Sequence, residues 1–282
     1  MAQPQHWLPG PIERPSTVEA QLNYLAYTGE RPVTYARALA SGGRVDGPAA
    51  EPHRVSIANA RRLDWLPALD RNGFQLLSHR SRLTDFSHEE AIRSIYYPEA
   101  IEAISKATGA VKVVVFDHTL RYAKPNHGEA GIREPGNRVH NDQTFVSGPR
   151  RVRDHLPADE AQQRLDKRHA IINFWRPISY PVQNWPLAMC DAQSIEPGDL
   201  VPTDLVYPDK VGETYSFRHN AAHRWYYFPD QAPDEVLLLK IFDSRTDGTA
   251  RLTAHTAFDD PTSPPDALPR RSIELRTLVF WD

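Results

Sequence analysis

The sequence predicts a mainly β protein with flanking helices, folded as a double-stranded β-helix, which is the jelly roll of cupin-like proteins. Its 282 residues include 25 prolines and 14 glycines, a composition that favours short strands and loops over long helices. Apolar residues make up 40% of the chain and aromatic residues 10%, which is enough for a sizeable core. In the second half, short β-branched and aromatic runs alternate with turn residues, as in a sandwich or barrel.

The chain is expected to form a single domain, residues 1–282, with two parts. Residues 1–110 are predicted to be a helical and loop region that packs on the barrel, and residues 111–282 are predicted to be the jelly-roll core. Near the start, Ser16 or Thr17 is a suitable cap for a helix over residues 17–27.

Two further helices are predicted just before the barrel. Ser87 and Glu90 have the spacing of a capping box, in which each side chain binds the backbone amide of the other residue. Pro98 fits the first turn of the next helix, because it lacks the N–H group that a helix interior needs. Gly109 is suited to end that helix.

Strands are predicted wherever a short apolar or β-branched run lies between turn residues. The run Val111 to Phe116 is typical of a strand that is buried on both faces. Turns such as Glu196-Pro197-Gly198-Asp199 separate the later runs. The predicted strands cover residues 54–58, 73–77, 111–116, 170–175, 186–190, 200–206, 213–217, 224–228, 235–242, 252–256 and 273–281.

The composition also restricts the partners and the compartment. A formal net charge of −3 gives no basic field for nucleic acid or an anionic membrane, so a small molecule is the expected ligand. A homodimer is compatible with the sequence. The single cysteine, Cys190, favours a reducing compartment. Residues 1–10 lack a signal-peptide pattern, and no apolar run approaches the ~18 residues of a membrane span. We therefore expect a soluble, cytoplasmic protein.

His140 and Asp142 form the motif that carries most of the functional argument. A His-x-Asp tripeptide at the end of an extended segment directs an imidazole and a carboxylate toward one point in space. With a third ligand from far downstream, the pair would complete the two-histidine, one-carboxylate triad of Fe(II) oxygenases, which leaves three coordination positions open. The tripeptide alone is not specific, since it occurs by chance in many chains of this length.

Two histidines on strand-like runs compete for the third position. His223 opens a run of aromatic residues, and His255 opens the sequence His-Thr-Ala-Phe-Asp-Asp. A 2-oxoglutarate-dependent enzyme also needs a cation shortly after the distal histidine to hold the far carboxylate of the cosubstrate, and arginine offers a bidentate, permanently charged fork. Arginines follow His255 in this way, so His255 is the preferred ligand, and His223 is then a pocket residue.

Arg270 and Arg276 are the two candidates for this carboxylate anchor. Arg276 lies inside the predicted last strand, where strand alternation puts it on the same face as Glu274. Arg270 lies at the entrance of that strand. The sequence alone does not choose between them.

Aromatic side chains are candidates for a substrate pocket. Trp175, His223, Trp225 and Tyr227 are expected to line an apolar pocket for a molecule such as a terpenoid or polyketide. For each of them a core position is the competing interpretation, since aromatic residues in strands usually belong to the core.

Six stretches, taken together and in this order, have a familiar pattern: Arg138–Thr144, Phe174–Pro177, Pro186–Ala192, His223–Pro229, Asp234–Lys240 and His255–Pro261. They resemble the AsaB-like hydroxylase/desaturase family of secondary metabolism, to which a fungal endoperoxide-forming oxygenase and a cephem methoxylase subunit are also similar. The resemblance covers about residues 60–282, and its order is far more specific than the His-x-Asp tripeptide alone.

The resemblance implies a jelly-roll enzyme that uses Fe(II), 2-oxoglutarate and dioxygen to oxidise a C–H bond of a secondary metabolite, by hydroxylation, desaturation or endoperoxide formation. It implies His140, Asp142 and His255 as iron ligands and either Arg270 or Arg276 as the carboxylate anchor. Because the family is diverse, two alternatives stay open. One is a non-catalytic, partner-dependent subunit of a biosynthetic enzyme complex, and the other is a jelly-roll metalloenzyme that does not use 2-oxoglutarate.

Overall fold

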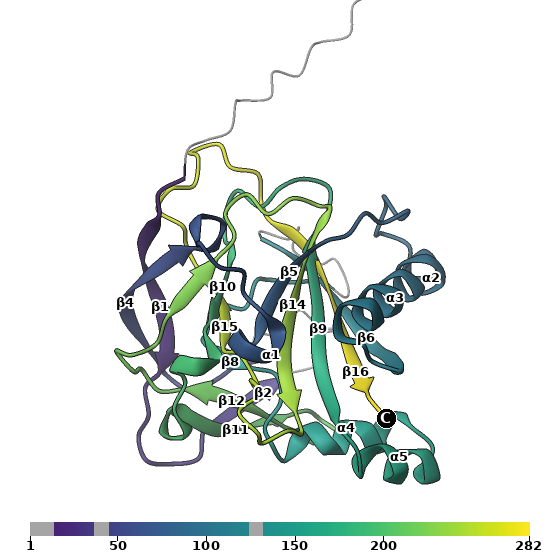
Figure 1. Ribbon diagram of the computed structural model, residues 1–282. Coiled ribbons are helices and arrows are strands. Elements are labelled where there is room, and N and C mark those ends of the chain that lie inside the picture. Colours follow the sequence, from purple (N-terminus) through teal and green to yellow (C-terminus); the bar gives the residue numbers. More distant parts are fainter. Residues whose placement is uncertain (1–13, 37–44, 124–131) are drawn as a thin grey trace, which may run out of the picture.

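Two β-sheets that face each other make up most of the protein (Figure 1). The computed structural model describes residues 14–36, 45–123 and 132–282. The ten-stranded sheet has the order β1 (Thr17–Leu25), β4 (Ala50–Asn59), β13 (Trp225–Tyr227), β10 (Leu187–Cys190), β15 (His255–Ala257), β8 (His140–Asn141), β12 (Val211–Phe217), β11 (Leu200–Val206), β2 (Val33–Ala36) and β3 (Val45–Asp46). The six-stranded sheet has the order β5 (Phe74–Ser78), β14 (Glu235–Asp243), β9 (His169–Pro177), β16 (Arg271–Phe280), β6 (Lys112–Tyr122) and β7 (Ile132–Arg133).

The helices lie outside the sheets (Figure 1). They are α1 (Leu69–Asn72), α2 (Glu89–Ala91), α3 (Tyr97–Thr108), α4 (Ser147–His155) and α5 (Ala158–Leu165), with a π-helical turn over Ile92–Tyr96 and 3₁₀ turns at Ala60–Arg62, Ala192–Ser194 and Pro197–Asp199. In the described ranges, no helix combines the length and the apolar character that crossing a membrane would require.

Apolar cores on both faces of each sheet hold these layers together. Between the sheets, Trp175 and Leu278 of the six-stranded sheet belong to one core with Met189 of the ten-stranded sheet. On its other face, the six-stranded sheet packs against α3 through residues such as Ile104. The ten-stranded sheet curls until β1 contacts β12, and it encloses a third core around Trp225. Each strand of the barrel region therefore has an inner face, toward the opposite sheet, and an outer face.

The N-terminal part differs from the prediction. Residues 17–27 were expected to form a helix, and this is wrong: Thr17–Leu25 is β1, which pairs antiparallel with β4. From Val18 to Tyr24 every second residue is buried, which is the period of a strand and not of a helix, and Leu25 at the end of β1 is buried as well. Because β1 and β4 join one sheet and β5 joins the other, the chain before residue 110 completes both sheets.

Of the two helices predicted before the barrel, the second ends where it was predicted to end, but the first does not begin as predicted. Gly109 ends α3 in a left-handed conformation with φ 70°, and its N–H donates to the Ser105 carbonyl at 2.8 Å. The predicted capping box at Ser87 is wrong, because α2 begins only at Glu89 and no side chain caps it. The widened π turn lies directly before Pro98, whose ring would clash with a carbonyl of a regular helical turn.

The strands predicted beyond residue 110 are confirmed in their order, and with them the jelly roll. The bounds move by a few residues, most clearly at β6, which runs to Tyr122 instead of residue 116, and at β15, which starts at His255 instead of residue 252. The helices α4 and α5 were not predicted. They lie between β8 and β9, where Val152 of α4 packs into the core between the sheets.

Candidate metal centre

His140, Asp142 and His255 lie together on the inner face of the ten-stranded sheet. His140 and His255 are direct neighbours in the antiparallel pair of β8 and β15, with ring centroids 4.4 Å apart. On its other side His255 is opposite Met189, a residue of the core between the sheets. One ligand atom from each of the three residues lies within 4.8 Å of the others. The structure therefore brings His255, and not His223, to the predicted ligand pair.

Backbone carbonyls determine which ring nitrogen of each histidine is available to a metal. His140 Nδ1 lies 2.8 Å from the Arg138 carbonyl oxygen, and His255 Nδ1 lies 3.4 Å from that of Thr253. A carbonyl oxygen only accepts, so in the neutral rings Nδ1 carries the proton and Nε2 keeps its lone pair. His140 Nε2 faces Asp142 Oδ1 at 3.5 Å. Both imidazoles thus offer Nε2 as the ligand atom.

Asn173 orients the carboxylate of the triad from the opposite sheet. Its Nδ2 donates to Asp142 Oδ2 at 2.8 Å, which leaves Oδ1 on the side of the histidines. Asn173 is fully buried in the middle of β9. Asn173 was not predicted from the sequence, although an amide within the apolar run Ala170 to Trp175 indicates a buried polar group that needs a partner.

The surroundings of Asp142 and His255 favour the protonation states that a metal needs, whereas at His140 the effect of burial is outweighed by Asp142, which raises the pKa of that imidazole. Burial alone would raise the pKa of Asp142, but the hydrogen bond to His140 and the charges of the two histidines and Arg276 hold that pKa well below its usual value. Burial lowers the pKa of His255 to about 3, and the neighbouring His140 adds to this effect. An ionised carboxylate and a neutral distal imidazole are the forms that coordinate a divalent cation.

The donor set fits Fe(II). Two imidazole nitrogens and one carboxylate oxygen converge, and the second polar atom of each side chain is directed to a protein group. Three protein ligands on one side of an octahedral ion leave the opposite three positions for a cosubstrate and dioxygen. The arrangement has no thiolate, and the single cysteine, Cys190, lies on the outer face of the sheet.

Arg276, one of the two predicted anchors, is already neutralised by the protein. It lies on β16 opposite Asn173 and Asp117, and therefore on the inner face of the six-stranded sheet. Its Nε donates to Asp117 Oδ1 at 2.6 Å, and one terminal nitrogen donates to Thr119 Oγ1 at 3.2 Å. Its charge therefore supports the ionised form of Asp142 from behind the triad.

Arg270, the other predicted anchor, is buried without a carboxylate partner in the described part of the chain. Its side chain donates to the Trp185 carbonyl oxygen, while its Nε has no hydrogen-bond partner. Burial lowers the pKa of Arg270 to about 9, which reflects a guanidinium that lacks a counter-charge. Ser272, two residues further on, also has a buried hydroxyl without a partner. Two adjacent unpaired donors are the feature expected of a carboxylate site.

The aromatic residues predicted to line a pocket divide between the two faces. Trp175 lies on the inner face of β9, with the Arg270 guanidinium 5.5 Å from its ring. The prediction is wrong for Trp225 and Tyr227, which face the outer core, while the residue between them, Tyr226, faces inward. His223 also lies on the outer side, hydrogen-bonded to Tyr24 and Asp199 (two polar residues of that side).

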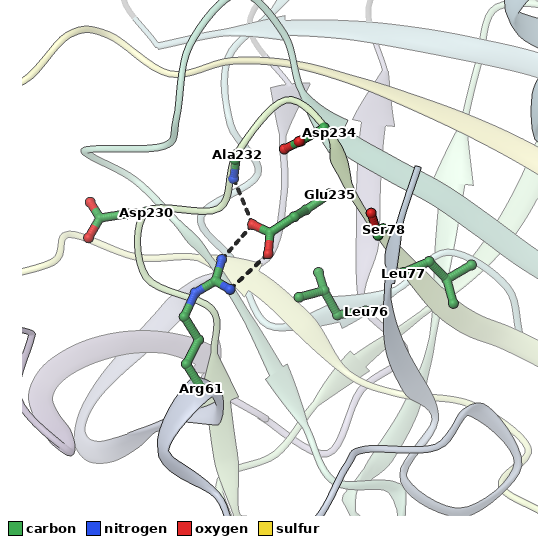
Figure 2. Close-up of a pocket in the computed structure, with 8 residues that line it drawn as sticks. All are labelled: Arg61, Leu76, Leu77, Ser78, Asp230, Ala232, Asp234 and Glu235. Carbon is green, nitrogen blue, oxygen red and sulfur yellow. Dashed lines mark hydrogen bonds and ion pairs between the residues drawn. The ribbon is translucent and has the colours of Figure 1, made fainter. Parts of the chain in front are cut away.

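A separate surface hollow of about 470 Å³ has no metal ligand in its lining (Figure 2). Figure 2 shows Arg61 directed at Glu235, to which it donates two hydrogen bonds of 2.8 and 2.5 Å. The Ala232 amide also donates to this carboxylate at 2.8 Å. Since these groups satisfy one another, the hollow is not a competing candidate for the active site.

A jelly roll that presents two histidines and one carboxylate on its inner face defines the class of non-haem iron oxygenases. Residues 22–280 match the family model described as an oxidoreductase/YMDC permease-like domain. The chain is 35% identical over 254 residues to the hydroxylase/desaturase CTB9 of Cercospora beticola, across 82% of this chain and 78% of that protein. The chain therefore belongs to this hydroxylase/desaturase family of oxidoreductases.

Two further comparisons agree with this assignment. The Fe(II)/2-oxoglutarate-dependent dioxygenase nvfI of Aspergillus novofumigatus is 33% identical over 240 residues, across 81% of this chain and 84% of that protein. A solved structure of the iron and α-ketoglutarate-dependent endoperoxidase NvfI superimposes with a TM-score of 0.82 at 27% identity, across 94% of this chain and 98% of that chain. The family resemblance drawn from the six sequence stretches is thus confirmed.

Proposed function

We propose that this protein is an Fe(II)/2-oxoglutarate-dependent oxygenase that oxidises a C–H bond of a small secondary metabolite. The observation that carries the proposal is the convergence of one ligand atom each from His140, Asp142 and His255 within 4.8 Å on the inner face of a jelly roll. The relatives named as hydroxylase/desaturase, dioxygenase and endoperoxidase support the same chemistry.

His140, Asp142 and His255 would hold the iron, and Asn173 would keep the carboxylate in place. Iron bound there supplies dioxygen activation coupled to the oxidative decarboxylation of 2-oxoglutarate to succinate. The protein's own task is binding and orientation. Neutral Nε2 atoms and an ionised Asp142 provide the ligand charges, and the pairing of Arg276 with Asp117 removes a free cation that would otherwise compete for the cosubstrate.

Arg270 and Ser272 are our assignment for the C5 carboxylate of 2-oxoglutarate, which is the carboxylate farther from the 2-oxo group. A dicarboxylate would give Arg270 the counter-charge that it lacks and would accept from the buried Ser272 hydroxyl. Removing one partner of such a buried charge pair costs on the order of 2–5 kcal/mol. At about 1.4 kcal/mol per decade, the affinity for 2-oxoglutarate should fall roughly 30-fold or more.

The substrate class follows from the inner face and from the relatives. Trp175 contributes an aromatic surface beside the anchor, which suits an apolar molecule such as a terpenoid or polyketide. Hydroxylation, desaturation and endoperoxide formation start from the same hydrogen abstraction, so the position of the substrate C–H bond selects among them.

The test is turnover of 2-oxoglutarate by the purified protein with Fe(II) and ascorbate. We expect succinate to form only when dioxygen is present, and we expect the rate to rise when a library of apolar metabolites contains a substrate. In parallel, Arg270→Gln should weaken 2-oxoglutarate binding at least 30-fold, as derived above. Arg271→Gln, which changes the next residue on the opposite face of β16, should not.

Three outcomes would contradict parts of this proposal. Iron binding without any use of 2-oxoglutarate would indicate the jelly-roll metalloenzyme that does not need this cosubstrate. Absence of iron binding would indicate the non-catalytic, partner-dependent subunit. Loss of 2-oxoglutarate binding in Arg276→Gln, but not in Arg270→Gln, would show that Arg276 binds the C5 carboxylate.

A further inference from the structure

Arg121 is a third arginine near the metal centre, besides Arg270 and Arg276, and it was not predicted from the sequence. It lies on β6 directly opposite Ser272 of β16. On this strand Asp117 and Thr119 both bind Arg276, so alternate residues from Asp117 to Arg121 share the inner face. Arg121 is therefore two positions beyond Thr119 on that face. It lies toward the start of β16, which Arg270 directly precedes.

The hydrogen bonding of Arg121 leaves most of its guanidinium available. Within the described residues it makes one hydrogen bond, from a terminal nitrogen to the Glu134 carbonyl oxygen at 2.9 Å, and no ion pair. Glu134 belongs to the segment that leads to Gly136, whose carbonyl accepts from the Ala257 amide of β15 at 2.7 Å. A Cβ on Gly136 would lie 3.5 Å from His140 Cε1. This hydrogen bond thus ties Arg121 to the segment that lies against both histidine strands.

The contacts of Arg121 and Arg276 place the two side chains on different sides of the triad. Arg121 is bound through Glu134 to the segment that lies against His140 and β15. Arg276 lies opposite Asn173, which donates to Asp142. The metal site therefore has one arginine on each side, and only Arg276 has a carboxylate partner among the described residues.

Arg121 and Arg270 repel each other. The low pKa of Arg270 is caused mainly by burial, and the charge of Arg121 lowers it further. Glu274 of β16 lies opposite Thr119, on the far side of Ser272 from Arg270, and its charge acts on both arginines, but it forms no ion pair with either in the described part of the protein. Two neighbouring guanidinium groups that no carboxylate pairs directly are unfavourable unless an anion lies between them. A ligand with two carboxylates would offset both charges.

We propose that Arg121 binds the C1 carboxylate of 2-oxoglutarate, the one beside the 2-oxo group, while Arg270 and Ser272 bind the C5 carboxylate. This inference rests on the proposed function. It fixes the cosubstrate at both ends, with its 2-oxo acid end on the histidine side of the site. It also adds a cosubstrate-binding residue that lies outside the last strand.

The two carboxylates can be tested separately with a pair of 2-oxo acids. 2-Oxopentanoate has the same chain length as 2-oxoglutarate, but a methyl group replaces its C5 carboxylate. Binding of each acid to the Fe(II)-loaded protein is measured by isothermal titration calorimetry without dioxygen, for wild type, Arg121→Gln, Arg270→Gln and Arg271→Gln. Iron content and thermal unfolding of each variant are measured alongside.

We expect Arg121→Gln to weaken both acids by the same factor, about tenfold or more, because a charge-assisted hydrogen bond to their shared end is lost. Arg270→Gln should weaken 2-oxoglutarate alone, and Arg271→Gln neither acid. If Arg121→Gln does not fold, Arg121→Lys must weaken both acids, because it keeps the charge but loses the fork. 2-Oxopentanoate could bind too weakly to measure. In that case the double variant Arg121→Gln/Arg270→Gln must lose affinity for 2-oxoglutarate by the product of the two single-variant factors, because arginines that bind different carboxylates act independently.

Several results would overturn the assignment. If Arg121→Gln weakens 2-oxoglutarate but not 2-oxopentanoate, Arg121 serves the C5 carboxylate instead. If neither acid is affected, Arg121 does not contact the cosubstrate. A different result would leave the assignment of Arg121 intact: if Arg121→Gln weakens both acids and Arg270→Gln weakens neither, only the assignment of Arg270 to the C5 carboxylate is wrong. If the wild-type protein binds neither acid, the proposed function and this inference both fail.

Discussion

Two clusters of histidine and aspartate lie on opposite faces of the ten-stranded sheet, and they use their hydrogen bonds differently. The inner cluster is the triad of His140, Asp142 and His255. In the outer cluster, Trp225 Nε1 donates to Tyr24 Oη at 2.8 Å, and Tyr24 Oη lies 3.0 Å from His223 Nδ1. His223 Nε2 in turn lies 3.0 Å from Asp199 Oδ2.

The donors and acceptors of the outer cluster form one directional chain. The Trp225 indole can only donate, so Tyr24 Oη accepts from it and donates its own proton to His223 Nδ1. His223 Nε2 then carries a proton and donates to Asp199. Both ring nitrogens of His223 are occupied, whereas each histidine of the triad has its Nδ1 at a carbonyl oxygen and presents Nε2 to the metal site. The histidines proposed as ligands therefore differ from the structural histidine, His223, in the use of the second ring nitrogen.

The largest expected effect is the loss of metal from the inner cluster. His140→Ala, Asp142→Ala and His255→Ala should each fold but should not retain Fe(II), because two remaining ligands cannot hold the ion in the facial arrangement. His223→Ala should retain the metal and lose stability. Iron content and thermal unfolding check both halves of this prediction. Iron at wild-type occupancy in the triad variants, or its loss in His223→Ala, would reverse the roles of the two clusters.

Local spacing explains which parts of the site the sequence could predict. His140 and Asp142 are two residues apart, so their joint direction follows from strand geometry, and His255 was chosen through the arginines that follow it. Asn173 could not be placed in the same way, because its bond to Asp142 joins the two sheets. Trp225 shows a further limit: alternation separates the two faces of a strand, but only the packing of the sheets decides which face is inner.

The fold shows the same division between local and long-range information. Apolar runs between turn residues predicted the barrel strands, and Gly109 marked the end of α3 because a left-handed residue is a local requirement. The segment Thr17–Leu25 was misjudged, since its apolar residues fit a helix cap and a strand alike, and its pairing with β4 decides the outcome. The short β15 has only three residues, and its bounds depend on β8 and β10 beside it.

A second prediction compares two asparagines that each donate to an aspartate. Asn173 Nδ2 binds Asp142 in the inner cluster, and Asn220 Nδ2 binds Asp199 in the outer cluster at 3.1 Å. Asn173→Ala should weaken metal binding about 10- to 100-fold, because the carboxylate loses the group that orients it. Asn220→Ala is the matched control and should leave metal affinity unchanged. Equal metal affinities in the two variants, measured by titration against a chelator, would remove Asn173 from the site.

A third prediction concerns the stability that the outer cluster provides. Tyr24→Phe removes the hydroxyl that links Trp225 Nε1 to His223 Nδ1, and it leaves both of these groups buried without a partner. We expect the free energy of unfolding to fall by about 1–3 kcal/mol, with metal affinity unchanged. Tyr27→Phe is the control, since Tyr27 is exposed and its hydroxyl donates to the Gly29 carbonyl oxygen at 3.3 Å, two residues along the chain. Denaturant unfolding measures both variants, and an equal loss in the two would contradict a special role for the chain of hydrogen bonds.

The smallest expected effect is the pH dependence of that stability. Burial lowers the pKa of His223 below its ordinary value near 6.5, although the hydrogen bond and charge of Asp199 oppose this. The unfolded chain therefore binds a proton at His223 more readily than the folded protein does, and the wild-type protein loses stability as the pH falls below about 6.5. His223→Gln removes this proton uptake together with the hydrogen bonds.

The difference in unfolding free energy between wild type and His223→Gln should thus shrink between pH 7.5 and 5.5, by at most about 1.4 kcal/mol, since one pKa unit corresponds to about that energy. Ionisation of groups distant from His223 cancels in the difference, whereas His219, whose pKa is lowered mainly by burial and also by the charge of His223, adds a smaller contribution. Denaturant unfolding at several pH values measures it. A difference that grows toward low pH would mean that His223 becomes charged in the folded state and pairs with Asp199 as an ion. The outer cluster would then be an ionic pair rather than a neutral chain, and occupation of both ring nitrogens would no longer suffice to tell the structural histidine from the ligands.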